Sequence, residues 1–167
     1  MIERISKVAL LAAVALFMAL VTLNNLIDYG SNFEFVKHVL SMDTTFPENR
    51  LRWRALTNPA VHHLFYALII GWEGLATLAI GWSAVRLWRL RSAPSEIFEA
   101  AKGFAVGALT LNLLMWFVTF LTVGGEWFVM WQSQIWNGQM SAFRMFTCVG
   151  IILLFLKTAD PAGTDPT

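Results

Sequence analysis

A single carboxylate in the middle of a long apolar stretch is the side chain best placed to do chemistry in this chain. Glu73 lies between Pro59 and Leu90, about 20 Å along a helix that would start at Pro59. A charge at the centre of a bilayer costs roughly 2.5–3.5 kcal/mol, so we expect Glu73 to face a bundle interior and to be neutral, hydrogen-bonded or paired. Asn112, at a comparable depth in the next apolar stretch, could be its partner. Glu73 could then serve a proton relay or ion site, or a polar clasp between helices, and we favour the clasp.

Arg144 is the second intramembrane candidate. It lies about 9 Å into the last apolar stretch, so its depth differs from that of Glu73 by roughly 10 Å. Glu126 and Asp28 lie closer to it in depth. We expect a structural ion pair at Arg144 rather than a site for a substrate anion, since a partly exposed arginine can also extend its charged end toward water.

Histidines at the outer ends of the apolar stretches could bind a metal. His38, His62 and His63 have Asp28, Asp43 and Glu126 potentially near them, a donor set that suits zinc or copper. Adjacent helical residues point about 100° apart, however, so His62 and His63 cannot easily share one metal. His38 and His63 would lie too shallow for a buried bis-histidine haem. We therefore predict histidines without a metal, and no cofactor.

Sequence motifs of enzymes are missing from the chain. There is no Ser–His–Asp order, phosphate loop or HExxH sequence, so we assign no catalytic residue and favour a protein without enzymatic activity. Cys148 is the only cysteine, which excludes an internal disulfide, a CxxC pair and thus disulfide-generating membrane oxidoreductases.

Composition indicates an integral membrane protein. Of 167 residues, 57% are hydrophobic and 14% charged, and the mean hydropathy is +0.58. An ordinary soluble domain is roughly 45–50% apolar and about 25% charged. The formal net charge of +1 leaves no basic excess for nucleic acid. The expected partners are the lipid bilayer and another membrane protein or a second copy of the chain.

The elements that must position these side chains are four apolar stretches. We predict an all-α, polytopic four-helix transmembrane bundle with short interfacial helices on its outer side, as one domain over 1–157. Asn58 and Pro59 are a good helix start, and Gly124–Gly125 and Asn137–Gly138 are typical of breaks. The first stretch is long for a signal peptide and lacks a clear cleavage site, so we interpret it as retained. The predicted spans are 5–27, 59–88, 103–123 and 139–157, and we expect 158–167 to be disordered.

An outer cap is predicted between the spans. After the first span, Phe33, Val36 and Leu40 recur at helical spacing and indicate an amphipathic helix, from about Ser31 to Ser41, lying in the membrane interface. A short polar helix is expected over 94–101, before the third span. The tryptophans after that span suit a membrane–water boundary, and the basic and aromatic cluster before the second span suits headgroup contact. These anchors are Trp127, Trp131 and Trp136, and Arg50, Arg52, Trp53 and Arg54.

Basic residues near the helix ends predict the orientation. The positive-inside rule places both termini in the cytoplasm. On that side lie Arg4, Lys7, Arg86, Arg89, Arg91, Lys102 and Lys157, whereas on the other side acidic residues balance Lys37, Arg50, Arg52 and Arg54.

Two segments resemble a known bacterial family. They are Val36-Lys-His-Val-Leu-Ser-Met-Asp-Thr-Thr-Phe-Pro47 and Gly124-Gly-Glu-Trp-Phe-x-Met-Trp-Gln-Ser133, the latter continued by Trp136-Asn-Gly-Gln139 and Ala142-Phe-Arg144. With these motifs the chain resembles the predicted small integral membrane proteins of domain of unknown function 2165 along nearly its whole length. The resemblance implies a four-helix protein of the bacterial inner membrane. It implies no activity, cofactor or functional residue.

Three hypotheses for function remain open. The one we favour is a non-enzymatic accessory or scaffold protein that binds another membrane protein, or lipid, through its outer cap and faces of small residues. The second is a small oligomeric transporter or proton-coupled component that uses Glu73, Asn112 and Arg144. The third is a membrane metal or redox protein that uses the outer histidines.

Overall fold

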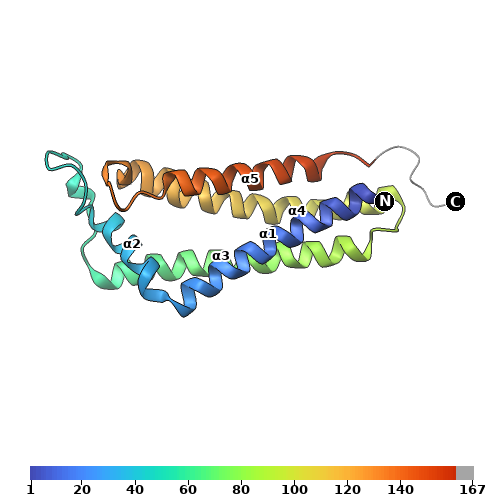
Figure 1. Ribbon diagram of the computed structural model, residues 1–167, viewed down its shortest axis with the longest axis horizontal. Helices are drawn as coiled ribbons and strands as arrows, with labels where there is room; N and C mark the ends of the chain where they lie inside the picture. Colours follow the sequence, from blue (N-terminus) through green and yellow to red (C-terminus); the bar gives the residue numbers. More distant parts are fainter. Residues whose placement is uncertain (161–167) are drawn as a thin grey trace.

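Four long helices run side by side, and the start of α1 and the end of α5 lie at the same end of the bundle (Figure 1). The computed structural model describes residues 1–160, which contain five α-helices and no strand. We call the end that holds the start of α1 the terminal end and the opposite end, which carries α2, the cap end. The all-α, polytopic fold class is thus confirmed. The long helices are α1 (Ile2–Ile27), α3 (Pro59–Arg89), α4 (Ser95–Leu114) with its π-helical continuation η2 (Met115–Trp127), and α5 (Gln139–Lys157).

Each long helix buries a stripe of side chains and exposes large apolar ones. On α1 the buried positions Leu11, Val14 and Met18 are three and four residues apart, and Asn25 follows seven residues after Met18, which is one face of a helix. Leu16, on the opposite face, is exposed. Exposed large apolar side chains along all four long helices are what a lipid environment permits, and the four helices are long and apolar enough to cross a membrane.

The first, second and fourth long helices begin and end within a few residues of the predicted spans. α3 starts as predicted, because the Asn58 side chain accepts a hydrogen bond of 2.9 Å from the backbone N–H of Ala60. α5 covers the same residues as the predicted fourth span.

The third long helix differs from the prediction at both ends. α4 starts at Ser95 and runs without a break into the third span, so the short helix expected over 94–101 is its first part. Glu99 and Lys102 form an ion pair of 2.7 Å where the two predicted segments join. At its other end the chain widens into η2 and continues through Gly124 and Gly125. These two glycines do not end the helix; because they lack side chains, other groups can pack closely against it. A β-carbon on Gly125 would lie 2.6 Å from the side-chain nitrogen Nε2 of Gln139.

The cap end has its own apolar core. α2 (Tyr29–Ser41) begins two residues before the predicted start, ends on Met42 in the left-handed conformation (φ 52°), and packs on α3. Short 3₁₀ turns, η1 (Arg52–Arg54) and η3 (Met130–Gln132), lie in the two connections of the cap. The interfacial position of α2 stays a prediction. Buried residues of the cap core are Val36, Val39, Leu40, Met42, Tyr66, Phe128, Val129 and Met130.

The two long connections of the cap are tied to each other. The hydroxyl of Thr44 donates to that of Ser133 at 2.8 Å, and the backbone N–H of Phe46 donates to Gln132 Oε1 at 3.2 Å. The backbone N–H of Leu56 donates to Leu40 O at 2.8 Å, which holds the first connection against α2. The cap is therefore a built structure and not a pair of loose loops.

Buried charges close the terminal end. We call Arg4, Lys7, Lys102 and Asp160, with Glu3 and Glu99 at their edge, the terminal charge cluster. Arg4 Nε donates to Asp160 Oδ2 at 2.6 Å, and Lys7 Nζ lies 3.5 Å from Asp160 Oδ1. Lys7 pairs with Glu3 at 2.8 Å and Lys102 with Glu99 at 2.7 Å. Both lysines also donate to the backbone carbonyl of Thr158, at 2.7 and 2.9 Å.

This cluster corrects the prediction for the tail. Disorder was expected from 158 onward, but Thr158 and Asp160 are anchored by buried cations that the sequence analysis had assigned to membrane orientation alone. The remaining residues of the predicted tail, 161–167, lie outside the described part of the chain.

Candidate functional site

Glu73 lies inside the bundle and is hydrogen-bonded. Its residue is 2% exposed, and its Oε2 accepts a hydrogen bond of 2.7 Å from Asn25 Nδ2 on α1. Asn32 Nδ2 on α2 in turn donates to Asn25 Oδ1 at 2.6 Å. A chain of polar side chains therefore joins α3, α1 and α2. Among residues 1–160, nothing donates to the other carboxylate oxygen, Oε1.

The local sequence explains why α1 comes close enough for this contact. Gly74, next to Glu73, leaves room for α1, because a β-carbon there would lie 3.8 Å from Thr22 Cγ2. Thr22 and Thr77 satisfy their hydroxyls on their own helices, at Met18 O and Glu73 O, and lie 3.5 Å apart across the two helices. Small and threonine side chains at such crossings allow close backbone approach.

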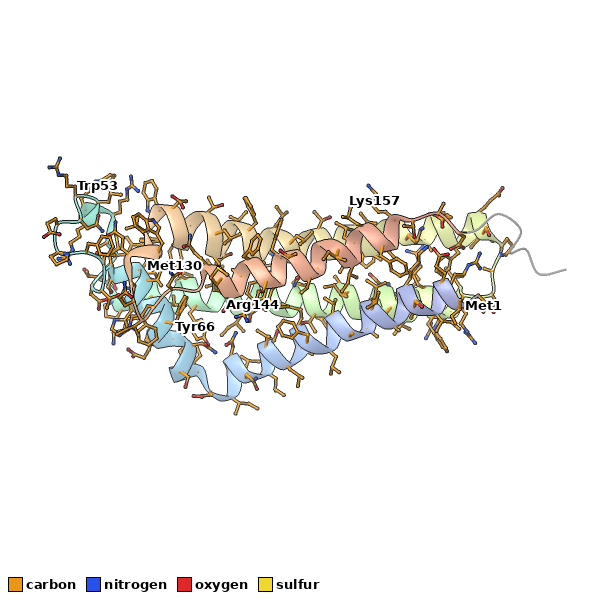
Figure 2. The ribbon with its side chains drawn as sticks, turned by 45° about the horizontal axis from the view of Figure 1, so that its top comes forward. Met1, Trp53, Tyr66, Met130, Arg144 and Lys157 are labelled. Atoms are coloured by element: carbon orange, nitrogen blue, oxygen red, sulfur yellow. The ribbon has the colours of Figure 1, made fainter. Side chains whose placement is uncertain are left out.

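Glu73 borders a cavity of about 200 Å³ at the junction of four elements. Tyr66, one of its walls, lies where α2 meets the bundle (Figure 2). The Tyr66 hydroxyl donates to the backbone carbonyl of Asn25 at 3.4 Å, so it helps hold the end of α1. The remaining lining residues are Val21, Asn25, Asn32, Phe35, Val36, Ile69, Trp116 and Phe120. This Glu73 cavity is large enough for several water molecules or a small solute.

An indole N–H of the cavity wall lacks a partner. Trp116 is 8% exposed, and its Nε1 is buried without a hydrogen-bond acceptor among residues 1–160. Most buried polar atoms in proteins are paired, with protein or with ordered water, so this buried indole nitrogen is an exception within the described chain. The indole lies in η2, and π-helical turns in transmembrane and other helices frequently occur at functional sites.

Asn112 does not partner Glu73, contrary to the prediction. Asn25 takes that role, because the crossing of α1 and α3 brings its amide to the carboxylate, whereas both amide atoms of Asn112 are buried without a partner in the described chain. Asn112 and Trp116 are four residues apart and so lie on one face of their helix. The sequence analysis missed Asn25 and Asn32 because they lie at the margin of an apolar stretch. Asn25 lies seven residues after Met18, and this spacing, which places both residues on one face of α1, could have indicated that Asn25 is buried.

Arg144 lies away from the Glu73 cavity and has no acidic partner. It is exposed on α5, where Nη2 donates to the hydroxyl of Ser141 at 3.3 Å (Figure 2). The ion pair expected with Glu126 or Asp28 is absent from residues 1–160: Asp28 accepts from Ser31 at 2.7 Å, and Glu126 is exposed. The bundle keeps Arg144 apart from both carboxylates, so the Arg144 guanidinium extends outward from α5.

The three histidines have separate partners. Buried His62 contacts Leu56 O through Nε2 at 2.6 Å, and His63 contacts the Tyr29 hydroxyl through Nδ1 at 2.8 Å. His38 stacks on Trp136 with ring centres 4.8 Å apart, and its Nδ1 lies 2.7 Å from Asp43 Oδ2. Within the described residues no three His, Cys, Asp or Glu side chains are grouped as a metal site.

Charged and aromatic side chains pair with one another at the surface of the cap. The Lys37 ammonium donates to Glu34 and holds the pKa of that carboxyl below its usual 4.5. Exposed Trp127 packs edge-on against Trp53 at 6.2 Å, and the Arg54 guanidinium lies 4.5 Å above the Trp127 ring. Trp131 is also exposed and packs against Phe46. Their role as membrane anchors stays a prediction.

Comparison with known proteins identifies a family and nothing finer. A family model described as a predicted small integral membrane protein, domain of unknown function 2165, matches residues 3–159. No curated protein and no solved structure matches the chain.

Proposed function

Because the chain belongs to the family of predicted small integral membrane proteins with domain of unknown function 2165, we propose that it is a non-enzymatic membrane component that binds a small solute or a proton at the Glu73 cavity. The single observation that carries the proposal is the buried Glu73 carboxylate in the wall of a cavity, with one oxygen, Oε1, that no group of residues 1–160 donates to. A polar clasp explains the hydrogen bond between Asn25 and Glu73. It does not explain why the helices leave about 200 Å³ open next to that bond.

The placement of charge supports an orientation for this component. Arginines and lysines gather at the terminal end, which the positive-inside rule assigns to the cytoplasm of a bacterial inner membrane. The cap end then faces outward. Since α2 contributes Asn32, Phe35 and Val36 to the cavity, the site belongs to the outer half of the bundle, and apolar core residues such as Leu11 and Leu109 fill the half below it.

The test is solute-dependent or pH-dependent stabilisation of the purified protein in lipid nanodiscs. We expect at least one small solute, or a change of pH reported by the infrared band of the Glu73 carboxyl, to act on the wild type and not on Glu73→Gln. The variant is expected to fold, because the glutamine oxygen can accept from Asn25. Glu126→Gln, at an exposed carboxylate, is the matched control and should behave as the wild type. If Glu73→Gln only alters stability and no solute or proton acts on either protein, Glu73 is a clasp.

A second candidate function is the accessory or scaffold role in a membrane complex. Gly103 and Gly107 on α4 form a GxxxG spacing that permits close helix contact, yet nothing in the described chain comes within 4 Å of a β-carbon built on either. That face is therefore open to another helix. Native mass spectrometry of the protein released gently from its own membranes tests this role: a second polypeptide supports it, and a bare monomer counts against it.

A further inference from the structure

The walls of the Glu73 cavity carry one kind of charge and several aromatic rings. This inference rests on the proposed function, since it names the ligand of the same cavity. Phe35 comes from α2, Tyr66 from α3, and Trp116 and Phe120 from η2, with the last two ring centres 5.2 Å apart. Aromatic faces attract cations through the ring quadrupole, and more strongly when the cation is out of water.

The charge balance of the cavity favours a cation. Glu73 is the only acidic residue in its lining, and no lysine or arginine of the described chain lines it. An anionic ligand would meet the carboxylate without any compensating positive charge. A neutral ligand would leave an ionised Glu73 without an ion-pair partner, which is costly at this depth.

An organic cation suits the site better than a metal ion. Calcium takes six to eight oxygen ligands, and magnesium requires an octahedral set. Among its lining side chains the cavity offers two free oxygens, Oε1 of Glu73 and Oδ1 of Asn32, while Oε2 of Glu73 and both polar atoms of the Asn25 amide are engaged in the hydrogen bonds between helices. A few polar atoms and several rings match an alkylammonium ion, whose charge is spread over apolar groups.

The ligand class follows from these walls. We propose that the Glu73 cavity binds a small organic ammonium ion, with the ammonium group at Glu73 and the alkyl groups against the aromatic rings. A cavity of about 200 Å³ has room for a solute of the size of a small alkylammonium ion or amino alcohol. Trp116 contributes its ring to the wall, and its Nε1 is too deeply buried to contact the ligand.

The same ammonium chemistry occurs in free amino alcohols and in phospholipid headgroups. A phospholipid would bring its phosphate next to Glu73, where no cation lines the cavity. The free solute is therefore the expected ligand. The nanodiscs used in the test contain phosphatidylglycerol alone, and adding phosphatidylcholine or phosphatidylethanolamine in a separate arm shows whether a headgroup competes.

The experiment measures binding of four probes to the full chain by calorimetry and thermal shift. The probes are choline, tetramethylammonium, the neutral carbon isostere 3,3-dimethylbutan-1-ol, and acetate, all at equal ionic strength. We expect choline to bind at least about tenfold more tightly than the neutral isostere, because only the cation gains the carboxylate and the rings. Acetate should not bind. Competition by zwitterionic lipid headgroups as strong as that by free choline would overturn the assignment to a free solute.

Two variants separate the contacts. Glu73→Gln should remove the preference for choline over its neutral isostere. Trp116→Leu removes an aromatic ring from the wall, so it should weaken choline and tetramethylammonium alike, by about tenfold or less. Trp127→Leu, at an exposed ring of the cap, is the control. The probe comparison on the wild type holds even where a variant does not fold.

The outcomes distinguish this inference from the proposed function. Equal binding of choline and its neutral isostere, in wild type and Glu73→Gln alike, would overturn the ammonium assignment and leave the cavity as a site for neutral solutes. A response to pH alone, with no bound probe, would also overturn it while the proposed function survives as a proton site. No response to any probe or to pH would refute both.

Discussion

Removing the Asp160 carboxylate should destabilise the protein although Asp160 lies beyond the last helix. Arg4, Lys7 and Lys102 balance Glu3, Glu99 and Asp160, three cations against three carboxylates. In Asp160→Asn one buried positive charge loses its counter-charge. Arg4 is 4% and Lys7 1% exposed, so water cannot replace the lost carboxylate.

The magnitude follows from what each cation retains. Breaking a buried pair by removing one partner costs about 3–5 kcal/mol. Arg4 keeps hydrogen bonds to Arg91 O, Ala93 O and the Ser95 hydroxyl at 3.0, 2.6 and 2.9 Å, and Lys7 keeps its ion pair with Glu3. We therefore expect the low end, about 3 kcal/mol, which corresponds to a fall in Tm of roughly 6–12 °C for a chain of this size.

The assay is thermal unfolding in lipid nanodiscs, followed by circular dichroism at low and high salt. Glu126→Gln removes an exposed, unpaired carboxylate and should stay within about 0.5 kcal/mol of the wild type. The deficit of Asp160→Asn should persist at high salt, since buried pairs are screened weakly. A change no larger than that of the control, or one that vanishes with salt, would refute the buried cluster.

Three further predictions test other parts of the fold. Asn112→Leu should raise stability by about 1–3 kcal/mol in thermal unfolding, because two unpaired buried polar atoms are replaced by apolar ones of similar size; a loss would show that the amide is paired, for example by water. Gly125→Ala should change the stability by no more than about 1 kcal/mol, since the flexible Gln139 side chain, whose Nε2 would lie 2.6 Å from the new methyl group, can move away and alanine favours helix; a loss of more than about 2 kcal/mol in thermal unfolding would show that Gln139 is held in place. The pKa of Glu34 is lowered in the folded protein, which predicts a small stabilisation that is complete above the unfolded pKa of 4.5 and is lost as the pH falls through the folded pKa. A nuclear magnetic resonance titration of Glu34 checks the direction of this shift, and Lys37→Gln should return the pKa toward 4.5.

Much of the architecture could be predicted because membrane spans follow from length and hydropathy. The Asn58 cap and the apolar runs fixed α3 and α5 closely. The third long helix was harder. Glycine pairs end helices often enough that Gly124–Gly125 suggested a break, whereas here the same absence of side chains admits Met130 and Gln139 against a continuing π-helix.

The site was predictable only in part, because partners depend on how helices cross. The cost of burying a carboxylate correctly directed Glu73 to the interior. Its partner was assigned by depth alone, which pointed to Asn112, while the crossing of α1 over α3 selects Asn25. The contacts of the terminal charge cluster could not be predicted from the sequence either, since Arg4 and Asp160 are 156 residues apart.

The terminal charge cluster also sets an order of events during synthesis. Arg4 and the carboxylate that neutralises it are 156 residues apart, so this ion pair can form only after all four long helices have been made. Before that point Arg4 can form its hydrogen bonds to Arg91 O, Ala93 O and the Ser95 hydroxyl, and Lys7 its ion pair with Glu3, but the charge of Arg4 has no carboxylate partner in the cluster. Neutralisation of the cluster is therefore a late step of assembly, and a chain that is cut before Asp160 is expected to hold the start of its first helix less firmly.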